Sequence, residues 1–249
     1  MKRRTRQMLR ALRAVPLPVR AAAAVLVLLA MLGAANWLYQ AARKPSELLF
    51  PVSGSLFKTP AATWREYGAL FREHATEVIS PELLAALAQI EGGGNPLART
   101  YWRWQVAWNP FEVYQPASSA VGMMQITDAR FAEARRYCIH RNKVAEEACW
   151  FNSLYNRLVP SHAVEMTAAF LDRAVANALG RARIGRATLE QKRDLAAVIH
   201  LCGASAGEAY ARRGFRPAAG QRCGDHGLAA YLGQVNAARR QFARLAAGA

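Results

Sequence analysis

An uncharged hydrophobic stretch lies close to the N-terminus of the chain. Residues 21–38 carry no charged side chain, and about 20 apolar residues suffice for a helix to cross a membrane. Only basic charges precede it: Lys2, Arg3, Arg4, Arg6, Arg10, Arg13 and Arg20. Because basic flanks stay on the cytoplasmic side, we predict a cytoplasmic tail at residues 1–20, a single-pass inner-membrane anchor at residues 21–40 and a periplasmic remainder.

The same stretch is also compatible with a secretory signal, because the small residues at 33–35 are typical of a cleavage site. Cleavage would release a soluble periplasmic protein, so both outcomes stay open from the sequence. A lipid-modified N-terminus is excluded, since the first cysteine is Cys138.

Beyond the hydrophobic stretch the pattern changes twice. Residues 41–61 contain Pro45, Pro51, Gly54 and Pro60, a composition that resists regular structure and predicts a tether. From residue 62 onward apolar positions follow helical spacing, with no convincing alternation of period two. The helical patterns cover residues 62–78, 81–91, 128–137, 146–158, 161–179, 188–210 and 228–245. We therefore predict one all-α domain at residues 62–249.

The charge balance narrows the class of partner. The chain has 33 Lys and Arg against 17 Asp and Glu, a net charge of +16. Outside the tail the arginines are scattered, whereas a nucleic-acid site would show clustered charge with aromatic platforms. We interpret them as a solvated surface that faces anionic polymers of the cell envelope, and we predict no nucleic-acid binding.

Four cysteines, Cys138, Cys149, Cys202 and Cys223, all fall in the predicted periplasmic part. An even number in an oxidising compartment indicates disulfides, for which three connectivities are possible. We favour the sequential pairs 138 with 149 and 202 with 223, because each closes a short segment that contains helix breakers. No Cys-x-x-Cys pair occurs and the histidines lack ligand spacing, so we predict no metal site.

Glu91 is the strongest candidate for chemistry. It ends a nearly apolar helix that begins after Ser80, a good N-cap, and stops at Gly92-Gly93-Gly94. Partial burial and the negative end of the helix dipole should both raise the pKa of its carboxyl group. A carboxylic acid that keeps its proton near neutral pH is suited to general acid catalysis.

Two sequence blocks extend this argument. Residues 89–96 read QIEGGGNP and residues 119–127 read SAVGMMQIT. In this order they resemble the signature of the soluble lytic transglycosylase family, which has the lysozyme-like fold. The resemblance covers roughly residues 62–249. It implies that Glu91 is the catalytic acid and base, and that Asn95, Gly122, Met123 and Gln125 belong to the substrate site.

The resemblance also implies a reaction. Glu91 would protonate the oxygen that links N-acetylmuramic acid to N-acetylglucosamine in peptidoglycan glycan strands, and would then accept a proton from the muramic acid's own 6-hydroxyl. The product would be a 1,6-anhydro sugar, formed without metal or cofactor. One carboxylic acid suffices, because the nucleophile belongs to the substrate, whereas most glycosidases use a pair. Of the nearby carboxylates, Glu112 lies in a loop and Asp128 is expected to cap a helix.

The sequence departs from the family pattern at two points and matches it at a third. Gly122 lies 31 positions after Glu91, which indicates an insertion rich in aromatic residues. The insertion either forms a sugar-stacking wall or lid, or is a loop pinned to the core. His200-Leu-Cys-Gly203 stands where the family has Tyr-Asn-Ala-Gly, so His200 is a candidate substrate contact. Tyr231-Leu-Gly-Gln-Val235 is similar to a late family motif whose tyrosine faces the catalytic glutamate.

Two other functions stay open. A muramidase similar to goose-type lysozyme would share the fold and the glutamate but would let water attack. A peptidoglycan-binding subunit of an envelope-spanning machine would bind strands without cleaving them. A specialised role with a secretion or other envelope complex is a further interpretation that depends on the membrane anchor.

Overall fold

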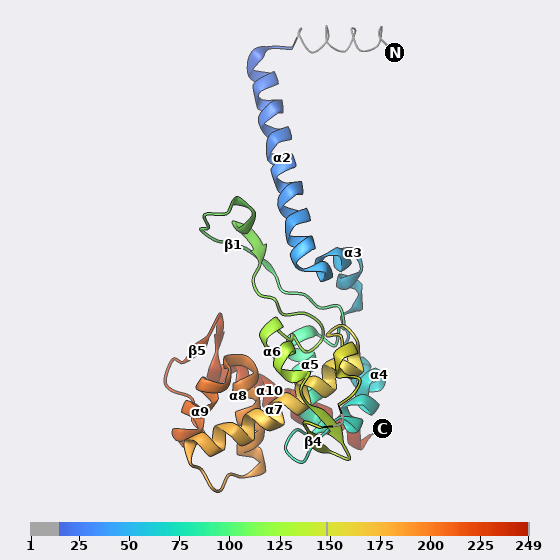
Figure 1. Cartoon of the computed structure of the whole chain (residues 1–249), viewed down its shortest axis with the longest axis vertical. Coiled ribbons are helices and arrows are strands. Elements are labelled where there is room, and N and C mark those ends of the chain that lie inside the picture. Colours follow the sequence, from blue (N-terminus) through green and yellow to red (C-terminus); the bar gives the residue numbers. More distant parts are fainter. Residues whose placement is uncertain (1–14, 148, 249) are drawn as a thin grey trace. The chain divides into compact units, whose positions relative to one another are not determined.

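The computed structural model describes residues 15–147 and 149–248 (Figure 1). Most of the predicted basic tail therefore lies outside the described residues. The chain divides into two compact units. The first combines residues 1–48 with residues 101–117, and the second contains residues 49–100 and 118–249. Each unit is described separately below.

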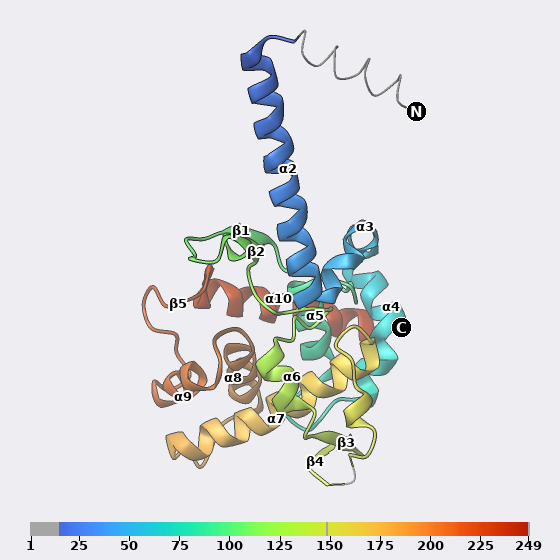
Figure 2. The same ribbon diagram turned by 45° about the horizontal axis from the view of Figure 1, so that its top comes forward.

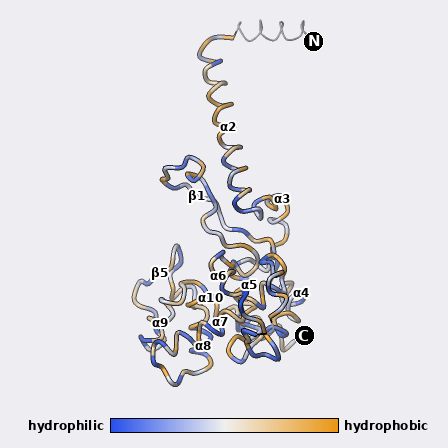
Figure 3. The backbone as a smooth tube through the Cα atoms, viewed as in Figure 1, coloured by the Kyte–Doolittle hydropathy of each residue, from blue (hydrophilic) through white to orange (hydrophobic). Residues whose placement is uncertain are grey.

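The first unit, here called the anchor unit, is built on helix α2 (Leu17–Arg43). Among the described helices only α2 is long and apolar enough to cross a membrane, and a helix of this length spans about 40 Å. Figure 3 shows hydrophobic colour along most of α2 and hydrophilic colour at its C-terminal end. It is followed by the 3₁₀ helix η1 (Pro45–Leu49). Helix α2 is therefore a candidate membrane anchor or signal sequence.

A small hairpin completes the anchor unit. Strand β1 (Trp102–Trp104) pairs antiparallel with β2 (Tyr114–Pro116), and the connection between them contains η3 (Pro110–Glu112). The hairpin contacts α2 through η3 and β2. The aromatic insertion predicted from the sequence thus belongs to the same unit as the hydrophobic helix. The residues that precede and follow the insertion in the chain belong to the other unit.

The second unit, here called the catalytic unit after the predicted catalytic residue Glu91, is mostly helical. Its helices are α3 (Phe50–Ser53), η2 (Gly54–Leu56), α4 (Pro60–Glu73), α5 (Pro81–Gly92), α6 (Asp128–Ala134), η4 (Asn152–Leu154), α7 (Pro160–Ala182), α8 (Leu189–Cys202), α9 (Ala204–Arg212) and α10 (Leu228–Ala247). Figure 2 shows α7, α8 and α9 packed together, and α5 packs chiefly against α10 and α4. The predicted helical class is confirmed.

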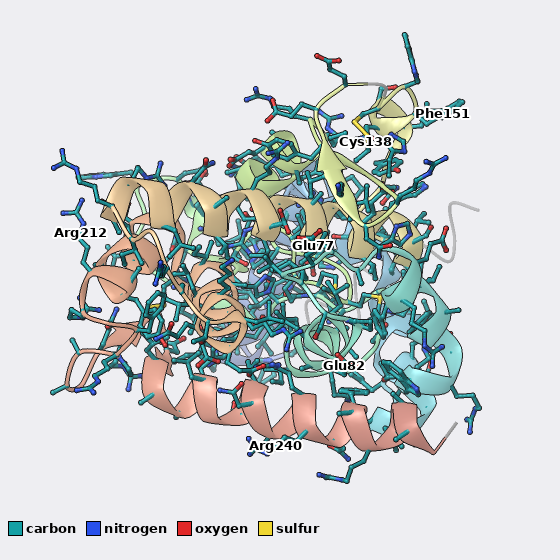
Figure 4. The ribbon with its side chains drawn as sticks, turned by 90° about the horizontal axis from the view of Figure 1, so that it is seen from below. Glu77, Glu82, Cys138, Phe151, Arg212 and Arg240 are labelled. Atoms are coloured by element: carbon teal, nitrogen blue, oxygen red, sulfur yellow. A yellow bond between two sulfur atoms is a disulfide. The ribbon has the colours of Figure 1, made fainter. Side chains whose placement is uncertain are left out.

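One hydrophobic core holds the catalytic unit together. Helix α5 is its centre, since all six residues from Leu83 to Ala88 are wholly buried. Figure 4 shows α7 and α10 on opposite sides of this core. Helix α4 adds aromatic rings to the core. Trp64 stacks on Phe71, and its ring centroid lies 5.9 Å from that of Phe242 of α10. A helix buried on every side reads as an unbroken apolar run, which is the pattern that α5 has in the sequence.

Two short strand pairs and two disulfides lie at the edge of the catalytic unit. Strand β3 (Cys138–His140) pairs with β4 (Lys143–Ala145), and β5 (Arg222–Cys223) pairs with β6 (His226–Gly227). Disulfides join Cys138 to Cys149 and Cys202 to Cys223, as predicted. Strands of two or three residues are too short to produce a detectable alternation, which explains why the sequence did not reveal them.

The structure corrects the predicted elements in three places. The expected helix at residues 146–158 contains only η4, and the pattern at residues 188–210 is split because Gly203 adopts a φ of 83° between α8 and α9. The expected tether at residues 41–61 consists largely of short helical turns. In the first two cases the hydrophobic spacing indicated helix, but the helix breakers set different boundaries. At residues 41–61 the prediction of irregular structure was wrong, because proline is tolerated in the first turn of a helix.

Candidate functional site

Glu91 lies in the last turn of α5. The helix begins at Ser80, whose hydroxyl accepts a hydrogen bond from the backbone N–H of Leu83, and it ends at Gly93 with a left-handed φ of 57°. Gly92 packs so closely that an added Cβ would lie 2.7 Å from the Met123 backbone. Because Gly92 has no side chain, the two sequence blocks can pack directly against each other beside Glu91.

Two side chains contact the Glu91 carboxyl group. The Tyr231 hydroxyl of α10 donates a 2.6 Å hydrogen bond to Glu91 Oε1. His200 Nε2, near the end of α8, lies 3.6 Å from the same oxygen. Both contacts involve Oε1, and the glutamate side chain is 18% exposed. This arrangement holds one carboxyl oxygen in place and leaves Oε2 as the oxygen suited to meet a ligand.

Arg130 of α6 orients His200. Its Nη2 donates a 2.8 Å hydrogen bond to the His200 carbonyl oxygen, and its Nη1 lies 3.5 Å from His200 Nδ1. Because a guanidinium group can only donate, Nδ1 must be the acceptor. The ring proton of neutral His200 is therefore assigned to Nε2, which faces Glu91.

The environment raises the pKa of Glu91. Desolvation by burial is the largest cause, and it outweighs the hydrogen bond from Tyr231 and the electrostatic effects of His226 and Arg130, which all lower the pKa. Burial also lowers the pKa of His200 well below its usual value, with Arg130 adding to this effect. His200 is thus neutral near pH 7, and its contact with Glu91 is a dipolar contact rather than an ion pair.

Tyr231 stays protonated in this site. Burial raises its pKa well above the usual value, and the neighbouring Glu91 raises it further. A tyrosine that keeps its proton remains a hydrogen-bond donor across the physiological pH range. The site therefore combines a protonatable carboxyl group with a fixed donor.

Another buried carboxyl group, Glu165 of α7, differs from Glu91. Its Oε1 accepts a hydrogen bond from the backbone N–H of Ile139, and its Oε2 accepts one from Tyr155. With both oxygens engaged by structural partners, Glu165 joins β3 to α7. Glu91, by contrast, has both of its side-chain contacts on Oε1 and remains partly exposed.

The second block forms a tight loop beneath Glu91. Gly122 has a φ of 78°, and an added Cβ would lie 2.3 Å from the Arg157 carbonyl oxygen. Gln125, itself at a φ of 44°, donates from Nε2 to the carbonyl oxygens of Gly122 and Ala98. Met123 is wholly buried. These three residues shape the loop through contacts with protein groups, whereas the sequence suggested contacts with glycan.

Asn95 has a similar internal role. Its side chain is wholly buried, donates a 2.6 Å hydrogen bond to the Ser53 carbonyl oxygen and accepts one from the backbone N–H of Leu97. Both ends of the amide are thus used to fix the turn that follows α5. Because the side chain is wholly buried, Asn95 has no exposed surface for a direct contact with substrate.

The Cys202–Cys223 disulfide fixes the late part of the site. It joins the end of α8, where His200 lies, to strand β5. The β5–β6 hairpin then carries His226 and leads directly into α10, which carries Tyr231. The crosslink therefore connects the segments that supply three of the groups acting on Glu91.

Sequence reasoning missed Arg130 and His226. Neither belongs to a block with recognisable spacing, and only the folded structure shows that both act electrostatically on the pKa of Glu91. The sequence also assigned the wrong cap to α6. Thr127 is the N-cap, because its hydroxyl accepts from the Arg130 backbone N–H, while Asp128 forms a 2.8 Å ion pair with Arg157.

Within the described residues no group of three or more His, Cys, Asp and Glu side chains is placed to hold a metal ion. Glu112, the other carboxylate considered from the sequence, lies in the anchor unit and pairs with Arg43 at 2.9 Å.

A mostly helical domain with one buried, protonatable glutamate at a helix C-terminus is similar to the lysozyme-like enzymes. A family model described as the transglycosylase SLT domain matches residues 69–197, just over half of the chain. The chain belongs to this family, and membership supports a lytic transglycosylase-like function on peptidoglycan. No curated protein and no solved structure gave a significant match.

Proposed function

We propose that this protein is a peptidoglycan lytic transglycosylase in which Glu91 is the general acid and base. The observation that carries the proposal is the state of Glu91: burial raises its pKa, one oxygen is held by Tyr231, and the side chain remains partly exposed. These properties match the requirements of a proton donor that acts near neutral pH.

In the first step Glu91 donates its proton to the glycosidic oxygen between N-acetylmuramic acid and N-acetylglucosamine. The bond from the muramic acid C1 to this oxygen breaks, and C1 acquires oxocarbenium character. Glu91 is then ionised, and the Tyr231 hydrogen bond and the charge of Arg130 stabilise the carboxylate. The groups that lower the pKa of Glu91 in the resting enzyme thus favour the state formed by proton transfer.

In the second step the Glu91 carboxylate removes the proton from the 6-hydroxyl of the same muramic acid. The oxygen O6 bonds to C1, which gives 1,6-anhydro-N-acetylmuramic acid and restores the protonated acid. No water is consumed. Neutral His200 keeps its proton on Nε2 in both steps. It stays a potential hydrogen-bond donor to Glu91 and does not itself exchange a proton.

Transglycosylation is favoured over hydrolysis by the groups around Glu91. In the described part of the chain these are Tyr231, His200, His226 and Arg130. An inverting hydrolase needs a second carboxylate to activate water, and this set supplies none. An intramolecular nucleophile needs no such group.

The experiment is product analysis with the full chain and its Glu91→Gln variant. Each protein is incubated in mild detergent with purified peptidoglycan, and soluble muropeptides are identified by mass spectrometry. We expect the wild type to release anhydro-muropeptides and the variant to be at least ~100-fold slower, the typical contribution of a general acid. Thr188→Ala, at the exposed cap of α8, is a matched control that should keep full activity.

Other products would identify the alternatives. Reducing-end muropeptides that also disappear in Glu91→Gln would mean a muramidase and would contradict transglycosylation. Binding of strands by a folded wild-type protein without any soluble product would instead indicate a binding subunit. Equal activity of the wild type and Glu91→Gln would remove Glu91 from the catalytic role.

A further inference from the structure

The aromatic hairpin is attached to one face of the hydrophobic helix. Asn36 of α2 donates to the Tyr114 carbonyl oxygen at 2.8 Å, and Gln40 donates to the Phe111 carbonyl oxygen at 2.5 Å. Arg43 pairs with Glu112 at 2.9 Å. Positions 36, 40 and 43 lie on one side of a helix. The hairpin is therefore fixed along the last two turns of α2.

Aromatic contacts strengthen this attachment. The Tyr39 ring of α2 stacks on Phe111 with centroids 5.3 Å apart, and the Tyr39 hydroxyl accepts a hydrogen bond from Asn109 Nδ2. Within the hairpin, Tyr114 stacks on Trp104 at 4.6 Å. These contacts fix the position of the hairpin loop along the axis of α2, close to Tyr39.

The hairpin loop exposes hydrophobic side chains. Trp104 is 75% exposed, and Val106 and Trp108 are fully exposed. Residues 104–111 contain no charged side chain. Soluble proteins expose single hydrophobic residues often, but a contiguous apolar group of this kind marks a binding surface.

The height of the loop along α2 indicates what covers this surface. The apolar run of α2 that starts at residue 21 ends at Leu38, before the polar side chains of Tyr39 and Gln40. The hairpin contacts begin at Asn36. Figure 1 shows the hairpin loop beside the lower turns of α2. If α2 spans a bilayer, the loop lies where the helix leaves the hydrocarbon layer. Trp and Tyr are enriched at this level, because their rings sit among the lipid headgroups.

We infer that the hairpin is a second membrane contact, which inserts Trp104, Val106 and Trp108 into the headgroup region of the leaflet on the domain's side. The inference rests on the predicted retention of α2 as a membrane anchor. Arg103, exposed between Trp102 and Trp104, is placed to meet anionic lipid phosphates. A helix alone can rotate about its axis, whereas a helix with a lateral contact presents one face to the membrane surface.

The same loop is poorly suited to bind glycan. A sugar-stacking ring works beside polar groups that bond to the hydroxyls, but here the polar groups of Asn109 are used by Tyr39 and by the Phe111 backbone N–H. Val106 between the two tryptophans is apolar and fully exposed. A lipid surface satisfies all of these side chains.

The test measures tryptophan quenching in the full chain reconstituted into vesicles of phosphatidylcholine and phosphatidylglycerol. Flotation after alkaline washing first establishes whether α2 is retained in the bilayer. Lipids brominated near the headgroup end of their acyl chains then quench tryptophans at the interface. Comparison of the wild type with Trp108→Phe isolates the emission of Trp108, and Trp150→Phe isolates an exposed tryptophan of the catalytic unit.

We expect Trp108 to be quenched at least about twofold more than Trp150, as an interfacial position requires. Val106→Asp should reduce the quenching of Trp108 while flotation and glycan cleavage stay at wild-type levels. Leu154→Asp makes the same kind of change at an exposed hydrophobic residue of the catalytic unit, and it should leave the quenching of Trp108 unchanged.

Two results would overturn the inference in distinguishable ways. If the protein floats with the vesicles but Trp108 and Trp150 are quenched equally, the hairpin does not contact lipid and the anchor stands. If the emission of Trp108 responds to peptidoglycan strands instead of brominated lipid, the loop belongs to the substrate site. Failure to float would remove the anchor, and with it the membrane contact, while leaving glycan cleavage to be judged by its products.

Discussion

The two units of this protein place their hydrophobic and polar side chains in opposite ways. In the catalytic unit the apolar residues of α5 are wholly buried and most charged residues lie on the surface. In the anchor unit the leucines and valines of α2 are more than half exposed, while Gln40 is buried and forms an internal contact. The first pattern suits water and the second suits a lipid environment, where polar contacts join elements.

The difference also shows which polar groups of the catalytic unit need a functional explanation. Glu91, Tyr231, His200 and Arg130 form a polar cluster in which Glu91 has one carboxyl oxygen without a structural partner among the contacts described above, unlike the fully engaged Glu165. Burial of such groups costs stability unless each is well paired, and Glu91 keeps its raised pKa even with its partners. Clusters of this kind are typical of catalytic sites.

The largest effect should separate the two kinds of hydrophobic residue. Leu87→Ala removes a wholly buried side chain of α5, so we expect the catalytic unit to lose about 2–5 kcal/mol of unfolding free energy. Leu28→Ala removes a leucine of α2 that is 56% exposed and should change the same quantity by less than about 0.5 kcal/mol. Urea dependence of hydrogen exchange in α7 measures both.

If Leu28→Ala destabilised α7 as strongly as Leu87→Ala, α2 would belong to the folding core of the catalytic unit. The contrast between the units would then be wrong. Val198→Ala, at another wholly buried position, is a second probe of the core and should behave as Leu87→Ala does.

A smaller effect should appear at the polar cluster. Because burial raises the folded-state pKa of Glu91 above 4.5, the wild type loses stability as the pH rises from about 4.5 through the raised pKa. Glu91→Gln cannot ionise and escapes this loss. We expect the variant to be more stable than the wild type at pH 7 by ~0.5–2 kcal/mol, with no difference at pH 4.

Thermal unfolding at both pH values checks this expectation. Glu82→Gln, in the first turn of the same helix, is the matched control and should show no such gain at pH 7. A Glu91→Gln variant that is less stable than the wild type at pH 7 would show that Glu91 is retained for structure.

The sequence predicted the helical class, both disulfides and the segment containing Glu91, because each leaves a local signal. The apolar run of α5 reports burial on all sides, and the short loops between paired cysteines limit their geometry. Arg130, by contrast, lies on α6, which packs against α7, and it reaches His200 of α8 only through the tertiary fold. Such contacts depend on tertiary structure and have no periodicity to detect.

The fate of the aromatic insertion was also beyond the sequence. Its rings fitted a sugar platform, a lid or a loop equally well, since all three need aromatic residues. The hydrogen bonds from Asn36 and Gln40 attach the insertion to α2, and they join residues more than 70 positions apart. Local patterns cannot distinguish which distant element a loop will meet.

The smallest effect should distinguish polar groups that tune chemistry from those that only join elements. Tyr231→Phe removes the hydrogen bond that lowers the pKa of Glu91, so the pKa of Glu91 rises. Since the acid must be protonated to act, the alkaline limb of the pH profile of kcat/KM should move to higher pH. Loss of one neutral hydrogen bond should lower the maximal rate about 2- to 10-fold. Gln40→Leu removes a bond of the same kind from the anchor unit and should leave the limb in place. An unmoved limb in Tyr231→Phe would mean that this tyrosine merely packs α10 against α5, so that the polar contacts of both units would be structural alike.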